Sequence, residues 1–78
     1  MDVKSIKALA QKYTVDELNK LADDFEATGT APVKTQEEAG QQMSDYLMAA
    51  ELRALVDKGI PVNEAMREFS KRVRGVMS

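Results

Sequence analysis

Apolar residues recur at helical spacing along most of the chain, in four separate segments. The first segment has Val3, Ile6, Leu9, Ala10 and Tyr13. The second has Leu18, Leu21, Ala22 and Phe25, and the last has Val62, Ala65, Met66, Phe69, Val73 and Met77. No segment alternates between apolar and polar residues for long enough to indicate a β-strand. The pattern predicts an all-α fold, a small four-helix domain with helices at about 3–13, 15–27, 36–58 and 62–76.

Polar residues mark where three of these helices begin. Asp2 can cap the first helix, because a short side-chain oxygen accepts from the free amides of a first turn. Thr14 and Glu17 have the spacing of a capping box, in which each side chain accepts a hydrogen bond from the other residue's backbone. Thr35 and Glu38 offer the same arrangement. We therefore expect helices to start directly after Thr14 and Thr35.

Glycine and proline mark where the helices end. Gly29 suits the left-handed conformation that closes a helix, and it opens the clearest loop, residues 28–34, which also contains Pro32. Gly59 and Pro61 stop the third helix, since glycine closes it and proline cannot continue it. The helices and this loop form a single domain spanning residues 1–78.

The third helix has an uneven apolar pattern. One face collects Ala39, Met43, Tyr46, Leu47, Ala50 and Ala54. The opposite face is polar at first, with Glu38, Gln41 and Asp45, and becomes apolar later, with Met48, Leu52, Leu55 and Val56. A helix that is apolar all round is either wrapped by its own domain or part of an interface. Both hypotheses stay open, and the second makes Met48, Leu52 and Val56 candidate interface residues.

Composition argues against catalysis. The 78 residues include no His and no Cys, the usual general base, thiolate nucleophile and ligands for zinc, haem and iron–sulfur clusters. Adjacent acids fall in predicted first turns, where they stabilise the positive end of a helix dipole. We expect no catalytic residue, no metal site and no cofactor. A chain this short also has a marginal core, which favours self-association.

A basic cluster stands near the end of the last predicted helix. Arg67, Lys71 and Arg74 share one stripe of that helix, opposite Phe69. Such a stripe can bind an anionic partner, including nucleic acid. A solvated face is the simpler interpretation, because Glu64 and Glu68 stand three or four residues before basic residues, at the spacing of helical ion pairs.

Several stretches resemble a family of small, uncharacterised, all-helical bacterial proteins, a domain of unknown function. They are the start Asp2-Val3-Lys4-x-Ile6-Lys7, the junction Tyr13-Thr14-x-x-Glu17-Leu18, and the ending Met66-Arg67-Glu68-Phe69-Ser70-Lys71-Arg72-Val73-Arg74. Gly40-x-Gln42-Met43-Ser44 is a fourth match. The resemblance implies an all-helical cytoplasmic protein and supplies no activity and no site residues.

The expected function is therefore association and not catalysis. We expect a cytoplasmic protein without a membrane segment, because no stretch approaches the ~18 apolar residues of a span and the start has no apolar signal region. The expected partner is a second copy of the chain, as a homodimer, or another protein that the chain serves as an adaptor. The alternative is a nucleic-acid accessory protein that uses the basic C-terminal helix. The tight turn between the first two predicted helices also suggests a helix-turn-helix, but the five acids of residues 14–30 would repel phosphates and disfavour DNA binding there.

Overall fold

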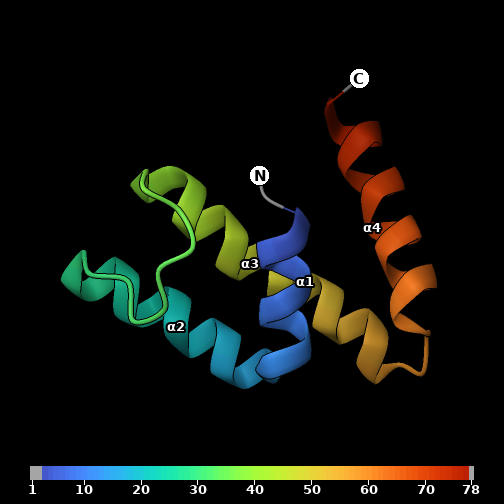
Figure 1. The fold of residues 1–78 in the computed structure, drawn as a ribbon, viewed down its shortest axis with the longest axis horizontal. Helices are drawn as coiled ribbons and strands as arrows, with labels where there is room; N and C mark the ends of the chain where they lie inside the picture. The colour runs from blue at the N-terminus through green and yellow to red at the C-terminus, as the bar shows by residue number, and fades with distance from the viewer. Residues whose placement is uncertain (1–2, 78) are drawn as a thin grey trace.

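Four helices make up the fold of the computed structural model, which describes residues 3–77 and the side chains of residues 3–71. The helices are α1 (Val3–Lys12), α2 (Val15–Thr28), α3 (Ala39–Asp57) and α4 (Val62–Met77). Residues 3–77 contain no strand, so the predicted all-α, four-helix fold is confirmed (Figure 1).

Helix α3 is the centre of the molecule. It is the longest of the four, and α1 and α2 both pack along it while touching each other much less. Helix α4 contacts the domain mainly through α3. Figure 1 shows α2 and α4 at opposite ends of the molecule, with α1 crossing α3 between them. The fold is thus two helices, α1 and α2, packed along α3, with α4 attached mainly through α3 as well.

The core lies between α3 and its neighbours. Its buried apolar side chains are Ile6, Leu9, Ala10, Leu18, Ala22, Tyr46, Ala49, Ala50, Leu52, Ala65 and Phe69. Two predictions for α3 are wrong: Leu47 was placed on the core face and is 51% exposed, whereas Asp45 was placed on the polar face and is fully buried. The reason is that a loop folds back over Asp45 and covers it, as described below. Val3, predicted on the buried face of α1, is 44% exposed.

The first capping box forms as predicted. The Thr14 hydroxyl accepts from the Glu17 amide at 3.2 Å, and the Glu17 carboxylate accepts from the Thr14 amide at 3.0 Å. Gly29 ends α2 with a φ of +74°, and its amide donates to the Phe25 carbonyl at 2.8 Å. These local signals are sufficient to set both ends of α2.

The second capping box is wrong. Helix α3 begins at Ala39 and not near residue 36, and its N-cap residue Glu38 makes no side-chain cap hydrogen bond. The Thr35 hydroxyl is occupied elsewhere, because it donates to Asp45. The connection between α2 and α3 is consequently residues 29–38, longer than the predicted loop. Asp2, the predicted cap of α1, lies outside the described residues.

Candidate functional site

Three polar residues of α3 hold the connection 29–38 against the helix. Gln42, Asp45 and Tyr46, which we call the polar clamp, are all buried and stand at i, i+3 and i+4 on α3. The Tyr46 hydroxyl donates to the Val33 carbonyl and accepts from the Val33 amide at 3.2 Å. The Phe25 ring meets the Tyr46 ring edge to face, with centroids 6.1 Å apart. Burial raises the pKa of the Tyr46 phenol above its ordinary value.

The other two clamp residues bind the next part of the loop. The Gln42 carbonyl accepts from the backbone amides of Thr35 at 2.7 Å and Gln36 at 3.1 Å, and its amide group donates to the Thr35 hydroxyl at 2.9 Å. One oxygen of Asp45 accepts from the Thr35 hydroxyl at 2.9 Å and from the Gln36 side chain at 3.1 Å. Its other oxygen, Oδ1, is buried without a partner. The clamp therefore replaces ordinary backbone pairing for this loop.

A pocket of about 290 Å³ lies beside the clamp, between the end of α2 and the start of α3. Phe25, Ala31, Lys34, Gln36 and Gln42 are among its lining residues. The side-chain amides of Gln36 and Gln42 already form hydrogen bonds within the protein: Gln36 donates to Asp45, and Gln42 accepts from the loop backbone. Among the described residues, no three acids, cysteines or histidines lie close enough together to hold a metal ion. The observed hydrogen bonds of the clamp hold the connection 29–38 against α3.

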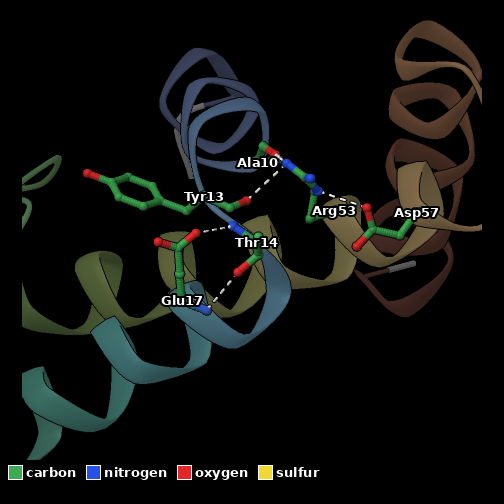
Figure 2. A network of polar contacts seen from close by, with 6 residues as sticks. All are labelled: Ala10, Tyr13, Thr14, Glu17, Arg53 and Asp57. Atoms are coloured by element: carbon green, nitrogen blue, oxygen red, sulfur yellow. Dashed lines mark hydrogen bonds and ion pairs between the residues drawn. The ribbon is translucent and has the colours of Figure 1, made fainter.

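Arg53 joins the end of α1 to α3. Its Nη1 donates to the carbonyls of Ala10 at 3.1 Å and Tyr13 at 3.2 Å, and its Nε donates to Asp57 at 2.9 Å (Figure 2). A guanidinium suits this place because the last carbonyls of a helix lack intrahelical donors and carry partial negative charge. The same view shows the Thr14–Glu17 capping box directly after the end of α1.

The capping box also sets the charge state of its acid. The hydrogen bond from the Thr14 amide is the main reason that the pKa of Glu17 lies below its usual value, and the Thr14 side chain and the charge of Arg53 act in the same direction. All three contributions favour the carboxylate over the neutral acid. The start of α2 therefore keeps its negative charge to lower pH than a free glutamate would.

A second concave surface lies between the end of α3 and α4. Leu55 and Ile60 form its apolar edge, and four exposed residues of α4, which we call the α4 stripe, form the rest: Glu64, Arg67, Glu68 and Lys71. The volume of this groove is about 460 Å³. Within the part of the chain whose side chains are described, neither Glu64–Arg67 nor Glu68–Lys71 forms an ion pair. The predicted pairs inside this stretch of helix are thus not formed.

The predicted anionic-partner surface is only partly described. Arg67 and Lys71 are both exposed on the α4 stripe, and the side chain of Arg74 lies outside the described residues. Glu64 and Glu68 border the same groove as the two basic residues. The described surface is therefore a mixture of both signs of charge and not a continuous basic patch.

The three candidate interface residues of α3 differ in how deeply they are buried. Leu52 is fully buried in the core of its own chain, so its place as an exposed interface residue is corrected. Met48 and Val56 are half-buried and pack against that core. The apolar second half of α3 is covered largely by other helices of the same chain, which is the wrapped alternative left open by the sequence.

A family model matches the whole chain. The model of a protein family of unknown function, DUF6952, matches residues 1–78. No curated protein and no solved structure matches the chain. Within the described residues, no helix has the length and apolar character needed to cross a membrane.

Proposed function

The chain belongs to this family of unknown function, and we propose that it acts by protein–protein association, as a homodimer, and not as an enzyme. One observation carries the proposal: α4 is fastened to the domain by little more than one helix. Among its described side chains only Ala65 and Phe69 are buried, and its main contacts are with α3. The groove beside it is open and has an apolar edge.

Physical reasons connect this attachment to a partner. A helix in water draws most of its stability from tertiary packing of one face, because its backbone hydrogen bonds alone are marginal. A domain of this size buries a smaller share of its surface than larger domains do. A second chain packed on α4 and the groove would add contacts that the single chain lacks. The same surface would serve an adaptor, with another protein in place of the second copy.

Two further expectations belong to this proposal. The expected cytoplasmic location is kept, and the polar clamp is assigned to stability because its hydrogen bonds are made to its own loop. The alternative of a nucleic-acid accessory protein depends on Arg67 and Lys71. Their acidic neighbours Glu64 and Glu68 lower the positive potential there, so phosphate binding is disfavoured.

The mass of the protein in solution tests the proposal. Light scattering coupled to gel filtration at low salt should give a mass that rises toward twice the 8.6 kDa of one chain as the concentration reaches several hundred micromolar. A single-chain mass at several hundred micromolar would contradict the homodimer. Mixed DNA and RNA added to the same samples should leave the elution unchanged, whereas a shift with nucleic acid would favour the alternative.

A further inference from the structure

We propose that two copies of the chain pair through the α4 stripe, with their α4 helices antiparallel and a two-fold axis between Arg67 and Glu68. This inference rests on the proposed homodimer and names its surface and its geometry. The partner is a second copy of the chain, selected by the order of charges along the helix. The argument uses the position of the stripe, the sequence of its signs and the apolar edge beside it.

The stripe is an exposed side of α4 that borders the groove beside the end of α3. At about 100° per residue, Glu64, Arg67, Glu68 and Lys71 fall within roughly a third of the helix circumference. Ala65 and Phe69, which attach α4 to the core, are buried and lie on the other side of the helix. All four residues of the stripe are exposed and form no ion pair with one another. The stripe can therefore meet a partner without rearrangement of its own domain.

The order of charges is self-complementary under an antiparallel two-fold axis. An axis between Arg67 and Glu68 brings Glu64 of each chain opposite Lys71 of the other, and Arg67 of each opposite Glu68 of the other. Every facing pair has opposite signs. A closed two-fold interface uses the same patch on both chains, so a patch must complement itself in this way.

A parallel alignment and two antiparallel alignments with a shifted axis place like charges together. Parallel helices related by a two-fold axis would set each residue against its own copy, which gives four like-charge pairs. Moving the antiparallel axis to residue 66 sets Glu64 against Glu68, and moving it to residue 69 sets Arg67 against Lys71. Like-charge contacts suppress wrong registers and partners. Only the antiparallel axis between Arg67 and Glu68 gives all four residues of the stripe a facing residue of opposite sign within the stripe.

The groove gives the pairing an apolar component. Leu55 and Ile60 line it together with Glu64, the residue that faces Lys71 of the second copy. A lysine that reaches Glu64 can lay its methylene stem over this edge while its ammonium group stays in water. Because exposed ion pairs are individually weak and screened by salt, the dimer should dissociate more readily as ionic strength rises.

Complementary charge reversals test the geometry. Glu64→Lys alone and Lys71→Glu alone each set like charges opposite each other in a homodimer, and each should raise the dimer Kd at least tenfold. Mixing the two variants at equal concentration should restore dimers with a Kd within about threefold of the parent, because every facing pair in the mixed dimer has opposite signs again. Sedimentation equilibrium at low salt measures all three.

Matched controls separate the surface from general charge effects. Glu26→Lys and Lys20→Glu make the same charge changes at exposed positions of α2, and both should leave the Kd unchanged. If the parent is a monomer, the proposed homodimer is wrong. If the parent and both α4 variants dimerise equally, the homodimer stands and this surface is wrong.

A second pair of variants covers loss of helix. Glu64 lies in the first turn of α4, where a positive charge opposes the helix dipole. Should circular dichroism show lost helicity in Glu64→Lys, the same mixing test is made with Arg67→Glu and Glu68→Arg. Recovery of the dimer on mixing supports the pairing. Failure of that mixture to dimerise, with helicity kept, overturns it.

Discussion

Replacing Arg53 by alanine should lower the free energy of unfolding by more than the loss of an arginine on the surface of a protein usually does. The change removes three hydrogen bonds that Arg53 donates: one to the Ala10 carbonyl in the last turn of α1, one to the Tyr13 carbonyl directly after it, and one to Asp57. Its side chain is only 26% exposed, so the α1 carbonyls lie where water replaces the guanidinium imperfectly. The loss therefore acts on the junction of α1 with α3 and not on the surface alone.

The magnitude follows from the kind of bond. Hydrogen bonds to a charged group contribute about 1.5–3 kcal/mol each, and partial hydration of the freed carbonyls reduces this, so Arg53→Ala should cost ~2–3 kcal/mol in total. A domain of this length has roughly 4–12 kcal/mol of stability in all. For a domain of this size the loss corresponds to a fall in Tm of ~10–20 °C.

Urea unfolding followed by circular dichroism measures the effect, with two companion variants. Asp57→Ala removes only the exposed ion pair, so it should cost less than ~1 kcal/mol. Arg53→Lys keeps the charge and loses the fork that reaches two carbonyls, so its stability should fall between the parent and Arg53→Ala. The reasoning is refuted if Arg53→Ala changes stability by under ~0.5 kcal/mol. Equal losses in Arg53→Ala and Asp57→Ala would refute it too.

Three further predictions concern the capping box and the polar clamp. The pKa of Glu17 in the folded protein lies below its unfolded value near 4.5, so the contribution of its carboxylate to stability is complete above that pH and is lost as the pH falls through the folded pKa. The difference in unfolding free energy between the parent and Glu17→Gln should therefore shrink below pH 4.5, and a constant difference would contradict this. Tyr46→Phe removes both bonds to Val33 and should cost ~1–2 kcal/mol and speed tryptic cleavage after Lys34; an unchanged cleavage rate would count against the clamp. Thr35→Val should cost ~2 kcal/mol while leaving the far-UV helical signal of the folded protein intact, whereas a reduced helical signal would restore the capping interpretation.

The sequence predicted the four helices and the starts of all of them except α3. Thr14 and Thr35 look alike in the sequence, since each is followed three residues later by an acid. Thr14 caps α2 because its partners lie within the same turn. Thr35 does not cap α3, because its hydroxyl meets Asp45 ten positions along the chain. A local motif decides structure only where no distant partner competes for the same hydroxyl.

The rotation of α3 could be predicted only in part, for a related reason. Apolar periodicity identified a face that includes Tyr46, which is buried, and it also included Leu47, which is exposed. The polar residues Gln42 and Asp45 are buried instead, because the connection between α2 and α3 returns across them. Hydrophobicity alone carries no information about that return. The i, i+3, i+4 spacing of Gln42, Asp45 and Tyr46 was the only sequence feature that indicated this cluster. Without knowledge of the loop position, that spacing is the same as on an ordinary solvent-exposed helix face.

The burial of the apolar residues on α3 decides which kind of dimer interface the chain can form. Leu52 was a candidate residue for an apolar interface between subunits, but it is completely buried in the core of its own chain. What α4 and the groove offer a second chain is an apolar edge bordered by alternating charges. An interface of that composition gains specificity from charge order and little affinity from area. The assembly we propose is therefore a reversible, salt-sensitive dimer of folded chains, in contrast to an obligate dimer whose monomers cannot fold alone.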